Sequence, residues 1–222
     1  MPFSAFTEAE QEAIDKVLEF QRKFAPPSNH AITDASASEE KEMHIALDGN
    51  GVVKIDCAIH PASGGHMTQA MVCAANSSDG CHIIHNHPRQ GSLSSADWSV
   101  LAAHPRLQMT AVNSEGTTFR GRVLSAVCKL TIPIPFQHYF HVIEDEFEKK
   151  ISCWFENNNY DLGSFSCNNR WLVGRSIGER LQASGCAVFQ CIPKGSNEIA
   201  LGDPRAKEVE QFLNDRCGAV II

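Results

Sequence analysis

The segment from Cys81 to Asp97 constrains the fold more than any other part of the chain. It begins with a short apolar run, Cys81-His82-Ile83-Ile84-His85, whose length and composition are typical of a buried strand. His87-Pro88 follows, and a proline at this point forces the chain out of a sheet. Ser94 and Asp97 then have the spacing of an N-cap residue and an acidic third residue of a helix. The chain is therefore expected to form a strand, a loop and a helix in immediate succession.

The same segment predicts a divalent-metal site. In an extended chain, His85 and His87 project their imidazoles to the same side, because side chains alternate along a strand. Asp97, on the first turn of the predicted helix, offers a carboxylate that can return to the two rings. Two imidazoles and one carboxylate leave the fourth tetrahedral position open, which is the arrangement of catalytic zinc. Bound water then acquires a pKa of about 7 and becomes a nucleophile at cellular pH.

Plainer interpretations remain open at these positions. His85 and His87 could be loop histidines before Pro88, and Ser94 with Asp97 could form a helix cap alone. The capping interpretation is compatible with metal binding, because a capped first turn is a rigid mount for a ligand carboxylate. The order H-x-H followed by aspartate differs from the H-x-D…H triad of many iron(II) oxygenases, which favours zinc, although imidazole and carboxylate ligands alone also suit iron.

A metal-activated water needs a proton carrier, and Glu39, Glu40 and Glu42 stand upstream of the site. The following residues alternate as in a half-buried strand, with Met43, Ile45 and Leu47 facing one way and Glu42 facing the other. We choose Glu42 as the proton carrier, with Glu40 as the alternative.

The remaining pattern predicts an α/β chain in three parts. Residues 1–38 read as a helix over about Glu8–Phe24 followed by a linker, residues 39–130 as the core, and residues 131–222 as a smaller α/β C-terminal unit of unknown role. The core is expected to hold two hairpins, around the turns Asp48–Gly51 and Asn113–Gly116, and a helix over 67–74. The C-terminal unit is expected to hold helices over 139–151, 170–183 and 204–215 and strands over 186–192 and 219–222.

The composition of the chain limits the classes of partner that we expect it to bind. The net charge is −7 and no dense cluster of Lys or Arg occurs, so a nucleic-acid partner is not expected. No apolar stretch approaches the roughly 20 residues of a membrane span, and no signal peptide is recognisable, so we expect a cytoplasmic protein without a membrane partner. Nine cysteines without a CxxC pair argue against a disulfide framework or a zinc ribbon, and we expect most of them to be reduced and buried.

Together, these residues resemble a known signature. Glu42 opening an apolar strand, then H-x-H-P, then S-x-x-D with its aspartate about ten residues after His87, resembles the JAMM (JAB/MPN) zinc metalloprotease motif. The His85-Asn86-His87-Pro88 form and the strand–turn–strand after Glu42 are similar to bacterial JAB and RadC-like members. The resemblance covers roughly residues 40–128.

The resemblance implies a fold and an activity. The fold would be a cytidine-deaminase-like JAB/MPN core, a mixed β-sheet flanked by helices. One Zn²⁺ per chain would be held by His85, His87 and Asp97. Glu42 would take a proton from zinc-bound water and pass it to the leaving amine, and Ser94, or else Ser95, would stabilise the oxyanion.

The implied reaction is hydrolysis of an isopeptide or peptide bond at the C-terminus of ubiquitin or a ubiquitin-like protein. The alternatives are a RadC-like metal-dependent role in DNA processing or mobile elements, which the acidic balance disfavours, and a non-catalytic MPN scaffold. Such scaffolds characteristically lack the ligands that this chain retains.

Overall fold

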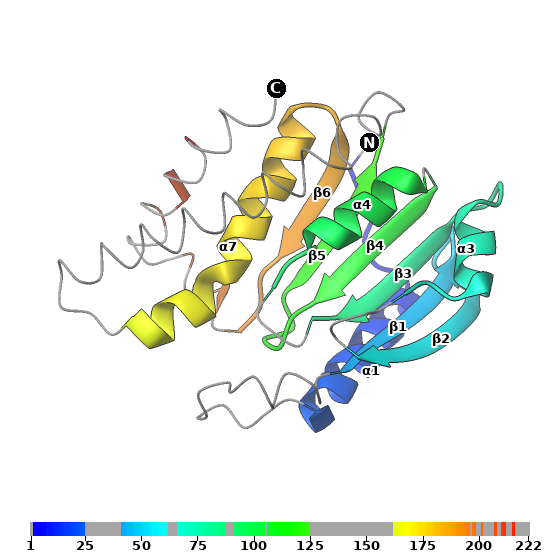
Figure 1. Cartoon of the computed structure of the whole chain (residues 1–222), viewed down its shortest axis with the longest axis horizontal. Helices are drawn as coiled ribbons and strands as arrows, with labels where there is room; N and C mark the ends of the chain where they lie inside the picture. The colour runs from blue at the N-terminus through cyan, green and yellow to red at the C-terminus, as the bar shows by residue number, and fades with distance from the viewer. Residues whose placement is uncertain are drawn as a thin grey trace.

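The computed structural model describes residues 2–24, 41–61, 66–87, 91–104, 106–124 and 162–195, with a few single positions up to residue 215. Within these residues the chain forms a six-stranded mixed sheet with helices on both faces (Figure 1). The strands are β1 (Lys41–Asp48), β2 (Lys54–Pro61), β3 (Cys81–Asn86), β4 (Leu107–Val112), β5 (Thr118–Val123) and β6 (Ala187–Ile192). The helices are α1 (Glu8–Phe24), α3 (Gln69–Ala75), α4 (Ser95–Ala103) and α7 (Leu162–Ala183).

The strand order is β2-β1-β3-β4-β5-β6. Two antiparallel hairpins, β1–β2 and β4–β5, flank the centre of the sheet, and β1 also runs antiparallel to β3. The single parallel pair described, β3 with β4, is connected through α4, since parallel neighbours need a crossover. This connection places the start of α4 immediately after the loop that leaves β3.

All six residues of the central strand β3 are buried, so the strand contributes side chains to two cores. On one face Ile83 packs in a cluster with Trp98 and Leu101 of α4 and with residues of α3 and α7. On the other face Ile84 packs with Ile14 and Val17 of α1. Figure 1 shows α4 and α7 in front of the sheet and α1 behind it. Odd-numbered positions of β3 therefore face α4, and even-numbered positions face α1.

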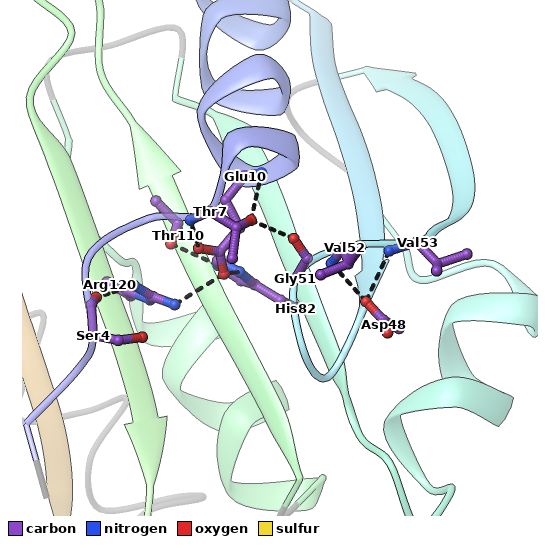
Figure 2. A network of polar contacts seen from close by, with 10 residues as sticks. All are labelled: Ser4, Thr7, Glu10, Asp48, Gly51, Val52, Val53, His82, Thr110 and Arg120. Carbon is purple, nitrogen blue, oxygen red and sulfur yellow. Dashed lines mark hydrogen bonds and ion pairs between the residues drawn. The ribbon is translucent and has the colours of Figure 1, made fainter.

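A buried polar network fastens the start of α1 to the back of the sheet (Figure 2). Glu10 Oε1 lies 2.6 Å from His82 Nδ1 and 2.9 Å from Arg120 Nη2, and His82 Nε2 lies 2.8 Å from Thr110 Oγ1. Thr7 caps the helix, because its Oγ1 accepts from the Glu10 N–H and its own N–H donates to Glu10 Oε2. Although burial raises the pKa of Glu10, His82, Thr7 and Arg120 together hold it below the ordinary value. The carboxylate is thus ionised and paired.

The same network reaches the β1–β2 turn. Thr7 Oγ1 donates to the carbonyl of Gly51, and a Cβ at Gly51 would lie 2.5 Å from Glu10 Oε1. Gly51 also has φ of 68°, a left-handed conformation that glycine adopts without strain. Asp48 closes the turn by accepting from the N–H groups of Val52 and Val53 (Figure 2). The predicted Asp48–Gly51 turn is confirmed, and its last glycine is required by the approach of α1.

The predicted helix over Glu8–Phe24 and both predicted hairpins are confirmed. We expected residues 131–222 to form a smaller C-terminal α/β unit, and the division of the chain into three parts stays a prediction. In the described part of that stretch, β6 pairs with β5 over its full length and α7 contributes Trp171 and Leu172 to the α4-side core. The expected boundary near residue 130, the helices over 139–151 and 204–215, and the strand over 219–222 lie outside the continuously described stretches.

The expectation that most cysteines are reduced and buried is wrong for most of the described ones, because Cys57 and Cys73 are exposed, Cys191 is half-buried and Cys81 is the buried one. Cys57, Cys73, Cys81 and Cys191 are free, but Cys186 is disulfide-bonded. Burial raises the pKa of Cys81 to about 11 and that of Cys191 to about 12, so neither thiol is activated. None of the helices in the described stretches is long and apolar enough to cross a membrane.

Candidate metal centre

The two predicted histidine ligands lie at the end of β3. His85 is the Cα partner of His44 in β1 and of Ala111 in β4, so its position is held from both sides. The His87 N–H donates to the carbonyl of Val112 at 2.8 Å, which keeps the chain extended one residue beyond the strand. Both imidazoles therefore project to the α4 face, and their Nε2 atoms lie 3.0 Å apart.

Asp97 reaches the two rings from the first turn of α4. Its Oδ1 lies 3.4 Å from His85 Nε2, and its Oδ2 lies 3.3 Å from His87 Nε2. The carboxylate is oriented by a capping box, in which the Ser94 side chain accepts from the Asp97 N–H at 3.2 Å and the Ser94 N–H donates to Asp97 Oδ2 at 2.7 Å. Helix capping and ligand placement are thus combined in one local structure.

The spacing of these donors fits a small divalent ion. Among the described residues, His85, His87 and Asp97 form the only group of three such side chains whose ligand atoms all lie within 4.8 Å of one another. Tetrahedral ligands at about 2.0 Å from zinc lie about 3.3 Å from each other. The two Nε2 atoms lie 3.0 Å apart, and each contacts a different carboxylate oxygen of Asp97, at 3.4 Å for His85 and 3.3 Å for His87. The group could therefore bind a metal ion.

Electrostatics favour a cation at this point. Burial alone would raise the pKa of Asp97, but its contacts with His85 and His87 hold that pKa well below the usual range. Burial lowers the pKa of His85, and Asp97 opposes this only in part. At His87 the effect of burial is outweighed by the hydrogen bond and charge of Asp97, so its pKa is raised. The buried carboxylate of Asp97 and the two imidazoles beside it are the types of side chain that bind divalent metals.

The proton carrier chosen from the sequence lies beside this group. The β1–β3 register pairs His44 with His85, and continuing it by two residues places Glu42 opposite His87. Glu42 is largely buried, with 16% of its side chain exposed, and its charge contributes to raising the pKa of His87. Glu42 is outside the group of candidate ligand atoms, and its role as the proton carrier stays a prediction. Glu39 and Glu40 lie outside the described residues.

The structure places Ser94 as the N-cap of α4, with its hydroxyl committed to Asp97. Ser94 Oγ donates to Asp97 Oδ2 at 2.8 Å, in addition to accepting from the Asp97 N–H. Donation to a substrate oxyanion would require this hydroxyl to leave the carboxylate. Ser95 is the first residue of α4 and is buried. The oxyanion role of either serine stays a prediction.

His44 also lies at the site, and the sequence indicated it only as a histidine that borders the cleft, without a ligand or catalytic role. Its Nε2 lies 3.4 Å from Glu42 Oε2, and its ring centroid lies 5.1 Å from that of His85. His60 of β2 follows at 5.3 Å from His44. Glu42 and His44 are two residues apart in β1, so their side chains leave the same face of the sheet, and the register with β3 shows that His85 lies on this face.

Residues distant in sequence support the site from both faces. Gln21 of α1 is buried and donates its Nε2 to the carbonyl of His87 at 2.7 Å. On the other face, the loop before α4 lies directly on α7, since a Cβ at Gly174 would fall 1.2 Å from Ser92 Oγ. No sequence pattern indicates these two contacts, because each depends on how a helix docks against the sheet.

Comparison with protein-family models, with curated proteins and with solved structures gave no significant match.

Proposed function

We propose that this chain is a zinc-dependent hydrolase of the JAMM (JAB/MPN) type, which cleaves an isopeptide or peptide bond at the C-terminus of ubiquitin or a ubiquitin-like protein. The observation that carries the proposal is the convergence of His85, His87 and Asp97 on one point, with Glu42 beside them on the neighbouring strand. The mixed sheet, with α1 on one face and α4 on the other, is compatible with a JAB/MPN core.

The proposed roles follow from donor chemistry. His85, His87 and Asp97 would hold the metal through two imidazole nitrogens and one carboxylate oxygen. When bound, zinc lowers the pKa of water and polarises a carbonyl. Glu42 takes one proton from the attacking water as the new C–O bond forms, and donates a proton to the amine as the C–N bond breaks. The Ser94 hydroxyl would stabilise the negative charge that develops on the carbonyl oxygen.

Metal content and hydrolysis test the proposal together. The purified chain is expected to bind about one Zn²⁺. The zinc-loaded chain is expected to release the fluorophore from ubiquitin that carries 7-amino-4-methylcoumarin in amide linkage at its C-terminus. Glu42→Gln should keep the zinc and abolish the release, whereas His87→Ala should lose both. A folded wild-type chain that binds no zinc contradicts the metal centre.

The measurements separate the metal centre from the bond that is cleaved. A chain that binds one zinc but leaves the ubiquitin probe intact retains the metal centre and contradicts the proposed activity on ubiquitin. Full hydrolysis by Glu42→Gln would contradict the role of Glu42 and transfer it to Glu40 or to no residue of this segment.

A further inference from the structure

Asn86 stands between the two histidine ligands but points away from them. It follows His85 and precedes His87, and the alternation along β3 directs its side chain to the α1 side of the strand. The residue is completely buried. A buried amide needs hydrogen-bond partners, so its contacts show what it holds in place.

Both partners of the Asn86 amide are backbone groups of β1. The Met43 N–H donates to Asn86 Oδ1 at 2.7 Å, and Asn86 Nδ2 donates to the carbonyl of Lys41 at 3.1 Å. Those two groups belong to the peptide units immediately before and after Glu42. One side chain therefore fixes the backbone on both sides of the proposed proton carrier.

This contact begins where the ordinary ladder ends. The β1–β3 ladder runs from Asp48↔Cys81 to His44↔His85. One residue further on, the Met43 N–H donates to the side chain of Asn86. The amide carries one acceptor and one donor group, as a peptide unit does, so it continues the ladder past Glu42. An aspartate could accept from Met43 but could not donate to Lys41.

We infer that Asn86 is a positioning residue, which sets the direction in which Glu42 leaves β1 toward the metal ligands. This inference rests on the proposed function. With the peptide units on either side held, only the side-chain torsions of Glu42 remain free, and its carboxylate contacts His44 at 3.4 Å. Asn86 itself touches neither the substrate nor the metal. Because Asn86 lies between His85 and His87, the same short segment carries the two candidate histidine ligands and holds the backbone of Glu42.

The test uses Asn86→Leu, which has similar size and no hydrogen-bonding group. Metal binding should be unchanged, because Asn86 faces away from His85 and His87. Displacement of a catalytic group by about 1 Å costs about 100-fold in rate. We therefore expect kcat on the ubiquitin–aminomethylcoumarin probe to fall by about that factor, with KM and zinc content as in the wild type. Asn86→Asp keeps one of the two contacts and should show a smaller loss.

Asn76→Leu is the matched control. Asn76 also donates its side-chain amide to a backbone carbonyl, that of Val72 at 2.9 Å, but it caps α3 away from Glu42. Its removal should leave kcat unchanged. If Asn86→Leu does not fold, the kcat of Asn86→Asp tests the inference in its place.

A double-mutant comparison distinguishes positioning from general support. In a Glu42→Asp background the carboxylate is already displaced, so Asn86→Leu should cost less there than in the wild type. Equal fold-losses in both backgrounds, an unchanged kcat in both Asn86 variants, or loss of zinc along with the rate would overturn the inference while leaving the proposed function standing. A zinc-loaded wild type that does not cleave the probe would overturn both.

Discussion

Ser94→Ala is the substitution that best separates the roles combined at the start of α4. It removes the hydroxyl that donates to Asp97 Oδ2 at 2.8 Å and accepts from the Asp97 N–H at 3.2 Å. Loss of an N-cap side chain costs about 0.5–2 kcal/mol of stability. Loss of a contact that orients a metal ligand costs about 10- to 100-fold in metal affinity. Because the Ser94 N–H still donates to Asp97 at 2.7 Å, we expect the lower end, about tenfold.

Three measurements check these magnitudes. Chemical denaturation of the metal-free chain reports the cap, competition with a chelator reports zinc affinity, and kcat at saturating zinc reports the oxyanion role, which would add a loss of about 10²–10³. Ser99→Ala is the control, since the Ser99 hydroxyl donates to the Ser95 carbonyl in the same helix and does not touch Asp97. Wild-type zinc affinity in Ser94→Ala would refute the argument that the capping box orients the ligand. An unchanged kcat would refute the oxyanion role alone.

Three further predictions concern α1 and the residues of the sheet that it contacts. Gln21→Leu removes the donor to the His87 carbonyl and should weaken zinc binding about tenfold in the chelator competition. Unchanged zinc affinity would refute the idea that Gln21 holds His87 in place. Glu10→Gln leaves the Arg120 guanidinium buried beside a neutral amide and should cost about 3–5 kcal/mol of unfolding free energy in denaturant titrations. Adding Arg120→Met should recover part of that loss, and a further additive loss would contradict the pairing. Burial lowers the pKa of His82 despite the neighbouring Glu10. Between the lowered folded pKa and the unfolded pKa, the imidazole is therefore protonated in the unfolded chain and neutral in the folded chain. Stability should therefore fall as pH decreases from about 6.5 toward the lowered folded value, and His82→Gln should flatten that part of a Tm-against-pH curve.

Much of the fold could be predicted because its signals are local. The capping pattern and apolar spacing of Glu8–Phe24 and the turn residues Asp48–Gly51 each depend on a few neighbouring residues. The start of α7 could not be predicted, because the residues from Leu162 include glycine, serine and asparagine, which weaken the helical pattern. The place of β6 in the core sheet depends on pairing with β5, which no local pattern encodes.

The residues of the candidate site also differ in whether local sequence signals could predict them. His85, His87 and Asp97 were predictable because a two-residue spacing in a strand and a capped helix turn determine their directions. Gln21 was not, because its carboxamide lies on the buried side of a helix where a polar residue has no periodic signal. Its meaning depends on the docking of α1 onto β3, a contact across 66 positions in sequence.

The buried polar residues of β3 differ in how fully their polar atoms are paired, and the difference supports the proposed metal site at the end of the strand. His82 has partners on both ring nitrogens, Glu10 and Thr110, and Asn86 has partners on both amide atoms. His85 differs, because its Nε2 contacts only the other two candidate ligands and its Nδ1 is buried with no partner among the described residues. The other buried polar side chains of β3 named here are paired on both sides. For His85, burial lowers the pKa, and the neighbouring Asp97 carboxylate opposes this effect only in part. A divalent cation bound by the Nε2 atoms and the Asp97 carboxylate would pair with this imidazole at Nε2, while Nδ1 would carry the ring proton. The prediction is that zinc raises the stability of the wild type in proportion to its occupancy and leaves that of His85→Ala unchanged, as thermal unfolding at increasing zinc concentration would show.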